Sequence, residues 1–254
     1  MIALSNIKIK NKTKDLNTDL LAIGCYENKH DLSSLSLADL SLLKNAIKLD
    51  SFKGKKGEKI LIYGSGKIKR LLLWGLGKKN SITNDKLRAE GANIYSFVNS
   101  KKIGSFSIFL DTFGSSDKNC FQAISEGLVL GSYYFTTHKS KKAQNKTKKL
   151  NIISEKADKK ICMKGIAIAN SVSLARDLGN HPANICTPQY LADKVIEISK
   201  RKKMKSTIFD VKEFQKMKLG SFYGVARGAK EPAKFILTAY SGGNKKDPPI
   251  AFVG

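Results

Sequence analysis

The side chains best suited to metal-assisted or acid–base chemistry are few in this chain and stand far apart. His30, His138 and His181 are isolated, with no His-x-x-x-His pair and no nearby carboxylate at ligand spacing. We therefore expect each histidine to lie at the surface or to serve local structure rather than to hold a metal. The Gly-x-Ser-x-Gly sequence of serine hydrolases does not occur. No catalytic constellation can be assembled from these residues.

Two glycine-containing segments follow strand-like runs and could approach a phosphate group. Gly64-Ser-Gly66 and Gly75-Leu-Gly77 complete neither the Gly-x-Gly-x-x-Gly pattern nor a P-loop. We interpret both as turns that end a strand, and a phosphate or nucleotide role is the alternative. Gly224 and Gly228 likewise indicate a turn and a close approach of two backbone segments.

The charge of the chain suggests a nucleic-acid partner, because the sequence has 46 basic and 21 acidic residues and a formal net charge of +25. Only five of the basic residues are arginines, the type that base and bidentate phosphate recognition favour. Residues 1–80, 81–160 and 161–254 carry +9, +7 and +9, so the excess is spread. We interpret it as solvated surface and expect no nucleic-acid partner. The polar run 138–149 is interpreted as a loop, with a phosphate-binding patch as the alternative.

Length and composition set the class of protein. The chain has 254 residues, of which 41% are hydrophobic, which is enough for one large or two modest packed domains. No uninterrupted apolar run is long enough to cross a membrane, and no secretory signal begins the chain. Four separated cysteines without a Cys-x-x-Cys pair favour a reducing compartment. We expect a cytoplasmic protein that has no contact with a membrane.

The elements that would position any site alternate between strand and helix in the first 180 residues, which contain no proline. This order predicts an α/β domain whose sheet is covered on both faces. Strands are expected at Ile2–Ile9, Leu20–Cys25, Lys59–Tyr63, Arg70–Trp74, Ile94–Val98, Ser105–Leu110 and Leu150–Ser154. Helices are expected from a cap at Ser33 or Ser34 through Ile47, at Asn84–Gly91 and at Cys120–Phe135.

A long helix and a second alternating region follow. Residues 156–178 have helical spacing, and the expected buried stripe is Ile161, Gly165, Ile168, Val172 and Ala175. Thr187-Pro188 predicts the start of a helix that buries Leu191, Val195 and Ile198 and pairs Glu197 with Arg201. Asp210-Val-Lys-Glu213 has the form of a capping box before a short helix that stops at Gly220. Strands are expected at Thr207–Phe209, Phe222–Ala226, Phe235–Tyr240 and Ile250–Val253.

One segment has a specific likeness to known proteins. The sequence Ala-Arg-Asp-Leu-Gly-Asn-His-Pro-Ala-Asn-Ile-Cys-Thr-Pro-Gln-Tyr-Leu-Ala of residues 175–192 closely resembles the domain-joining region of the leucyl (cytosol) aminopeptidase family. The likeness continues through Phe-Tyr-Gly-Val-Ala-Arg-Gly at 222–228, Glu-Pro at 231–232 and Pro-Ile-Ala-Phe-Val-Gly at 249–254. It is weaker, but in the same order, from residue 52 to residue 135.

The resemblance implies a fold and an activity. The fold is a macro-domain-like amino-terminal α/β domain over residues 1–155, a joining helix over 156–180 and an incomplete second α/β domain over 181–254. Members of the family use two divalent metal ions, manganese or zinc, to hydrolyse the first peptide bond of peptides, and they assemble as hexamers. Two metals can hold both the attacking water and the carbonyl oxygen of the substrate.

The chain departs from the family pattern at its carboxyl end. In the family, Val-Gly is followed by Lys-Gly-x-Thr-Phe-Asp, which supplies the first metal ligands, whereas this sequence stops at Gly254. No catalytic, cofactor-binding or metal-binding residue can therefore be carried over to residues 1–254. Arg176, Asp177 and Asn184 match the motif, but we assign them a structural role. We expect this chain by itself to bind no metal and to be inactive.

Two alternatives remain. The first is a non-catalytic binding module in which the macro-like domain holds ADP-ribose or nucleic acid. The second is an unstable half-domain whose unpaired strand edges and apolar surface favour aggregation.

Overall fold

A computed structural model describes residues 6–10, 16–29, 32, 37–64, 66–115, 117, 119–140, 147–201, 204–244 and 246–254. The chain divides into two compact units, residues 1–175 and 176–254. The division falls inside helix α4 (Lys159–Asn180), which is 22 residues long. The domain limits expected at residues 155 and 180 stay a prediction.

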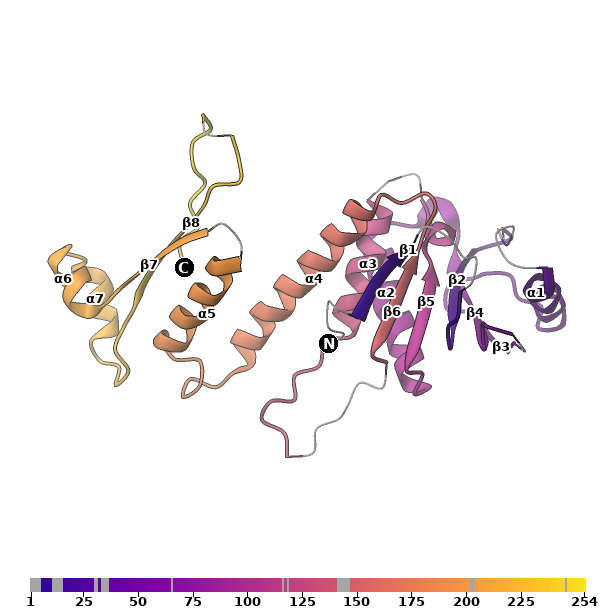
Figure 1. The fold of residues 1–254 in the computed structure, drawn as a ribbon, viewed down its shortest axis with the longest axis horizontal. Coiled ribbons are helices and arrows are strands. Elements are labelled where there is room, and N and C mark those ends of the chain that lie inside the picture. The colour runs from indigo at the N-terminus through magenta and orange to yellow at the C-terminus, as the bar shows by residue number, and fades with distance from the viewer. Residues whose placement is uncertain are drawn as a thin grey trace. The chain divides into compact units, whose positions relative to one another are not determined.

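The first unit is built on a six-stranded sheet (Figure 1). Its strand order is β1 (Ile7–Lys10), β6 (Lys149–Ile153), β5 (Ser105–Phe109), β2 (Leu21–Tyr26), β4 (Arg70–Gly77) and β3 (Lys59–Tyr63). Neighbouring strands run parallel, except that β3 runs antiparallel to β4. The central strand β2 pairs Leu21 with Leu71 of β4 on one side and with Ser107 of β5 on the other.

Helices cover both faces of this sheet, which confirms the α/β fold class. Alternate residues of β2 point to opposite faces, so Ala22 joins one apolar cluster while Leu21 and Ile23 join the other. The first cluster includes side chains of α2 (Asn84–Ser100), α3 (Cys120–Gly131) and α4. The second includes Leu43 of α1 (Leu37–Leu49). Since both faces are covered, every residue of β2 is buried.

The expected strand at Ile94–Val98 is wrong, because these residues continue α2 beyond the helix expected at Asn84–Gly91. Thr83 caps the helix by accepting a hydrogen bond from the backbone N–H of Lys86. Leu87, Ile94 and Val98 are buried at helical spacing on one face. The β-branched and aromatic residues of the segment suggested a strand, but the period of the buried positions is that of a helix.

Helices α2 and α3 lie unusually close together. A Cβ atom added to Gly127 would lie 1.9 Å from the backbone oxygen of Arg88, and one added to Gly91 would lie 2.6 Å from that of Ile124. The Arg88 side chain also donates from Nε to Oε1 of Glu126 at 2.9 Å. Glycines therefore set the distance between the two helices, and an ion pair links them.

The buried face of α4 differs from the expected stripe. Cys162, Gly165, Ile166, Ala169 and Ser173 are buried, whereas Ile161, Ile168 and Val172 are only partly covered and Ala175 is exposed. A Cβ on Gly165 would lie 2.3 Å from the backbone oxygen of Gln122 in α3. Close contact between α3 and α4 thus favours small side chains at the centre of the face, and the larger ones flank it.

The second unit contains α5 (Pro188–Arg201), β7 (Met204–Phe209), α6 (Val211–Lys216), α7 (Gly220–Ala226) and β8 (Phe235–Tyr240). β7 and β8 form an antiparallel pair. Two expected features are confirmed: the Thr187 hydroxyl caps α5 by accepting from the N–H of Tyr190 at 3.2 Å, and Asp210 and Glu213 form a capping box.

Several expectations for this unit are wrong. Phe222–Ala226 is part of the helix α7, because the Phe222 ring packs between Phe214 of α6 and Phe235 of β8. The helix expected to reach Gly220 ends at Lys216, and α7 begins at Gly220. Residues 250–253 form no strand within the described structure, since no strand pairs with them, and Phe252 is 95% exposed.

The buried face of α5 also differs from the expected one. Leu191 is exposed, Val195 and Ile198 are only partly buried, and Ala192 is fully buried. Glu197 pairs with Lys194 at 3.0 Å, and its expected pairing with Arg201 stays a prediction because the Arg201 side chain lies outside the described residues.

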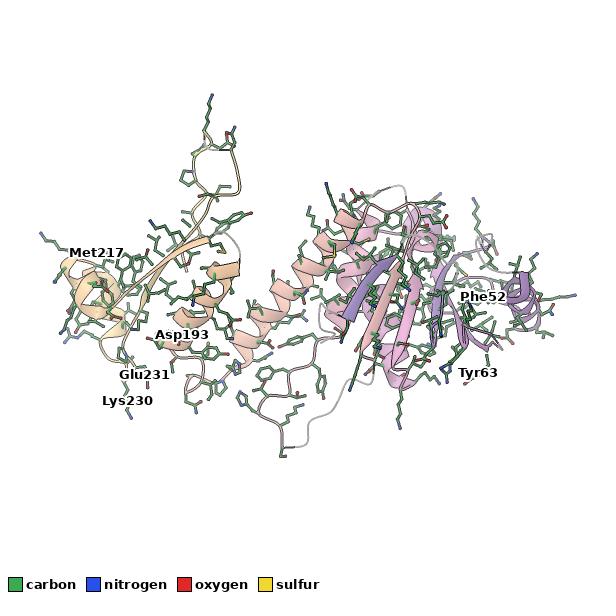
Figure 2. All side chains as sticks on the ribbon, viewed as in Figure 1. Phe52, Tyr63, Asp193, Met217, Lys230 and Glu231 are labelled. Carbon is green, nitrogen blue, oxygen red and sulfur yellow. The ribbon has the colours of Figure 1, made fainter. Side chains whose placement is uncertain are left out.

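Some features of the described residues concern the surface. Tyr63, labelled in Figure 2, ends the edge strand β3, and its exposed fraction is 71%. Among the described residues no helix has both the length and the apolar character needed to cross a membrane. The expected cap residues Ser33 and Ser34, the first residues of the strand expected at Ile2–Ile9, and residues 141–146 of the expected loop lie outside the described residues.

Candidate functional site

The segment 175–192 joins the last turn of α4 to the first turn of α5 through a tightly hydrogen-bonded turn. The backbone N–H of His181 donates to the oxygen of Asp177 at 3.1 Å. The N–H groups of Ile185 and Cys186 both donate to the oxygen of Pro182, at 2.9 and 3.0 Å. These backbone hydrogen bonds close the turn between the end of α4 and the start of α5.

Side chains of α5 and of the turn before it also contact one another. The rings of His181 and Tyr190 meet edge to face with centroids 5.5 Å apart, and His181 Nε2 lies 3.5 Å from the Tyr190 hydroxyl. Lys194 Nζ lies 5.8 Å from the centre of the Tyr190 ring. Arg176 and Asp177 lie in the last turns of α4, and Asn184 is exposed in the turn that follows. The absence of a catalytic role for these three residues stays a prediction.

Side chains that could bind a metal are dispersed. Within the described part of the chain, no three His, Cys, Asp or Glu residues lie close enough to hold a metal ion. His138 contacts the ring of Phe135, with centroids 5.6 Å apart, and His30 lies outside the described residues. The described residues therefore do not provide the ligands of a metal centre.

The cysteines are free thiols, and three of them are buried. Burial raises the pKa of the Cys25 thiol to about 12 and also raises the pKa of Cys162. A thiol with a raised pKa stays protonated at neutral pH and is a poor nucleophile. Cys186, in the joint between α4 and α5, is only half-buried.

We expect a thiol-specific reagent to modify one cysteine of the native chain rapidly and all four after denaturation, since Cys25, Cys120 and Cys162 are shielded from solvent. Counting modified thiols against time checks this. The Cys186→Ser variant should lose the rapid reaction. Rapid modification of any remaining thiol in native Cys186→Ser would show that solvent reaches the core, and would contradict the burial of Cys25, Cys120 and Cys162.

The carboxyl edge of the sheet contains a crevice with the geometry of an α/β ligand site. After β2 the chain goes to α1 on one face, and after β4 it goes to α2 on the opposite face. The adjacent parallel strands β2 and β4 therefore form a topological switch point, where α/β sheets generally bind ligands. A pocket of about 320 Å³ lies here, and Glu27 after β2 and Leu76–Lys78 at the end of β4 line it.

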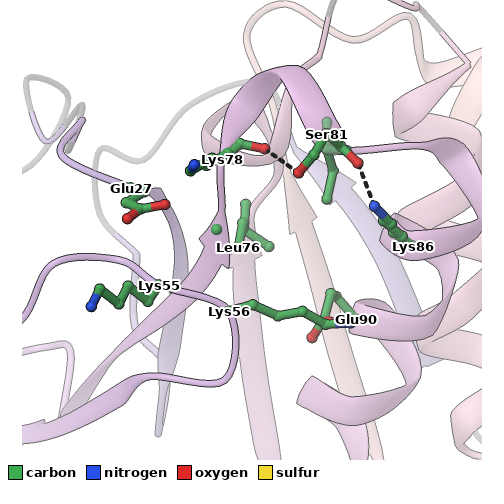
Figure 3. Close-up of a pocket in the computed structure, with 10 residues that line it drawn as sticks. Glu27, Lys55, Lys56, Leu76, Lys78, Ser81, Lys86 and Glu90 are labelled. Atoms are coloured by element: carbon green, nitrogen blue, oxygen red, sulfur yellow. Dashed lines mark hydrogen bonds between the residues drawn. The ribbon is translucent and has the colours of Figure 1, made fainter.

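Four lysines line this pocket: Lys55, Lys56, Lys78 and Lys86. Figure 3 shows Lys56 extending toward Glu90 across the base of the pocket. Glu90 is only 5% exposed, and its Oε2 accepts a hydrogen bond from Trp74 Nε1 at 2.9 Å. Lys86 Nζ donates to the backbone oxygen of Ser81 at 2.6 Å.

The glycines at the end of β4 have structural reasons to be glycine. A Cβ on Gly75 would lie 2.0 Å from the backbone oxygen of Lys55, and Gly77 has a φ of +76°. They let the loop before β3 lie against the strand ends, which places Lys55 and Lys56 at the pocket. The lysine cluster was not expected, because its members come from three separate segments that only the topology brings together.

Comparison with known proteins identifies relatives along nearly the whole chain. The sequence model described as "Cytosol aminopeptidase family, N-terminal domain" matches residues 22–142, and "Cytosol aminopeptidase family, catalytic domain" matches residues 173–254. A "Probable cytosol aminopeptidase" of Ralstonia pickettii is 35% identical over 93% of this chain, and one of Alkaliphilus oremlandii is 30% identical over 97%. The chain spans 51% and 52% of these two relatives, about half their length.

Solved structures share the fold. A mutant of tomato leucine aminopeptidase superposes with a TM-score of 0.73 at 24% identity, over 97% of this chain and 52% of that one. The bottromycin maturation enzyme BotP in complex with Mn superposes with a TM-score of 0.72 at 22% identity, over 88% of this chain and 45% of its own.

Proposed function

The chain belongs to the cytosol aminopeptidase family, and we propose that it forms the amino-terminal half of a metal-dependent aminopeptidase that releases amino-terminal residues from peptides. One observation carries this proposal. The models of the two family domains match in the family's order, and helix α4 begins between the matched regions and continues into the second. In this role residues 1–175 supply the amino-terminal domain, and residues 176–254 supply the first part of the catalytic domain.

The chemistry of the proposed enzyme requires groups that the described residues do not bring together. Hydrolysis assisted by two metal ions, manganese or zinc, needs several ligands converging on one site. We propose that these ligands lie outside residues 1–254 of the whole enzyme. The contribution of this chain would be the amino-terminal domain, the connecting segment 175–192 and the first elements of the catalytic domain.

A fusion protein tests the proposal. Residues 1–254 would be joined to the part of the Ralstonia pickettii relative that follows its matched segment. We expect the fusion to hydrolyse Leu-p-nitroanilide when manganese or zinc is present and to lose this activity on chelation. The relative itself, assayed in the same buffer, is the positive control. A folded fusion without activity, beside an active relative, would contradict the proposal.

The partners of the whole enzyme follow from the same proposal. We propose peptide substrates, a homo-hexameric assembly and a place in the cytosol. The free cysteines support a reducing compartment, and no disulfide links them in the described structure. Sedimentation of the fusion should give a mass six times that of one subunit, and a monomer that is fully active would contradict the hexamer.

A further inference from the structure

The pocket at the carboxyl ends of β2 and β4 continues into two neighbouring pockets. One, of about 410 Å³, shares Lys56 and Glu90 with it and is lined also by Lys59 and Trp74. The other, of about 330 Å³, shares Glu27 and Lys78 and adds Lys29 and Lys79. We call these three connected pockets the lysine groove.

Positive charge gathers in the lysine groove. Seven of its twenty-one lining residues are lysines. Its only lining carboxylates are those of Glu27 and Glu90. In the described part of the structure, none of Lys55, Lys56 and Lys78 forms an ion pair. Their ammonium groups are therefore available to a ligand.

The lysine groove lies at the topological switch point of the sheet. At such a point the connections after two adjacent strands go to opposite faces of the sheet, and a crevice forms between them. The loop before β3 approaches β4 so closely that only glycine fits at position 75, and this approach brings Lys55 and Lys56 opposite Lys78 and Lys86. Four cations around a pocket of about 320 Å³ match a compact anion with more than one negative charge.

We propose that the lysine groove binds a small metabolite that carries a diphosphate group beside hydroxyl groups, such as a nucleoside diphosphate. The diphosphate lies among Lys55, Lys56, Lys78 and Lys86, each of which binds a phosphate oxygen as a point charge. The buried carboxylate of Glu90 at the base of the groove accepts hydrogen bonds from hydroxyl donors and repels further phosphates. This site is separate from peptide hydrolysis and does not depend on the proposed peptidase function.

The single tryptophan gives a direct signal for binding. Trp74 lines one end of the groove, its Nε1 donates to Glu90, and Lys59 Nζ lies 5.7 Å from its ring centre. A ligand that contacts Glu90 or moves these lysines changes the surroundings of the ring. Titration of the full chain with ADP, pyrophosphate and AMP, followed by tryptophan emission and by calorimetry, therefore measures the affinity of the groove.

We expect ADP to bind saturably, pyrophosphate to bind more weakly and AMP to bind more weakly than ADP. The double variant Lys56→Gln/Lys78→Gln should weaken ADP binding by about tenfold or more, because it removes two charge-assisted hydrogen bonds. Both lysines are exposed, so the fold should persist, and circular dichroism checks this. The matched control Lys44→Gln/Lys48→Gln removes the same charge from exposed positions of α1 and should change the affinity less than twofold.

Three results would overturn the proposal. The first is the lack of saturable ADP binding by the folded parent chain. The second is equal weakening by the two double variants, which would assign the binding to diffuse charge. The third is tighter binding of single-stranded RNA than of ADP, with the same loss in both double variants, which would make the surface a nucleic-acid interface.

Discussion

Replacing Gly127 by alanine is expected to lower the free energy of unfolding of residues 1–175 by about 3 kcal/mol. An alanine in a helix normally stabilises it relative to glycine by about 1 kcal/mol. Here the added methyl group would lie 1.9 Å from the backbone oxygen of Arg88, and a backbone atom cannot move aside as a flexible side chain can. The helices α2 and α3 must therefore separate, which disturbs the core beneath them.

Urea unfolding followed by the emission of Trp74 measures this effect, since the only tryptophan lies in the core of the first unit. Gly104→Ala is the matched control, because no atom lies within 4 Å of the added Cβ. It should change the stability by less than about 0.5 kcal/mol. Equal unfolding midpoints for Gly127→Ala and the parent would contradict the close contact of the two helices.

Replacing Arg88 by methionine should also destabilise the first unit, by about 2–3 kcal/mol. Its partner Glu126 is 7% exposed, and Arg88 Nε lies 2.9 Å from Glu126 Oε1. Methionine keeps much of the apolar stem of arginine but leaves the buried carboxylate without its cation. The effect is measured in the same urea experiment.

Two further variants separate the buried pair from the exposed one. Asp85 also pairs with Arg88, but its side chain is 92% exposed, so Asp85→Asn should cost less than about 0.5 kcal/mol. Adding Glu126→Gln to Arg88→Met removes the unpaired charge and should recover more than half of the loss. If Asp85→Asn lowers the free energy of unfolding as much as Arg88→Met does, the pair of Arg88 with the buried Glu126 does not account for the loss.

The sequence was most informative where local pattern and tertiary burial agree. Strand β3 has the expected bounds, and β2 and β4 begin within one residue of expectation, because their apolar runs are short and bounded by turn residues. The capping box at Asp210 and the cap at Thr187 depend on neighbouring residues only, and both are present.

The errors occur where packing against distant residues decides the structure. Ile94–Val98 and Phe222–Ala226 have strand-like composition, yet both are helical, because their rings and branched side chains pack against other elements at helical spacing. The buried face of α4 differs from the expected stripe for a related reason. Its contact with α3 is too close for large side chains, and nothing in the spacing of α4 alone reveals that distance.

The lysine groove could not have been predicted from composition. Similar net charges of +9, +7 and +9 along the chain indicate a dispersed excess, and the lysines of the groove come from residues 29, 55–59, 78–79 and 86. The fold brings these lysines together, because the chain leaves β2 toward one face of the sheet and leaves β4 toward the opposite face. The family, in contrast, could be identified from residues 175–192, because its motif is continuous in the sequence and does not depend on the fold to bring residues together.

The activity of residues 1–254 without any fusion partner directly tests the proposed division of roles. We propose that this chain supplies the structural part of an aminopeptidase whose metal ligands lie elsewhere in the whole enzyme. The chain, purified and incubated with manganese or zinc, should release no p-nitroaniline from Leu-p-nitroanilide above a blank that contains chelator. Hydrolysis that depends on the metal, co-elutes with the chain and stops on chelation would contradict the claim.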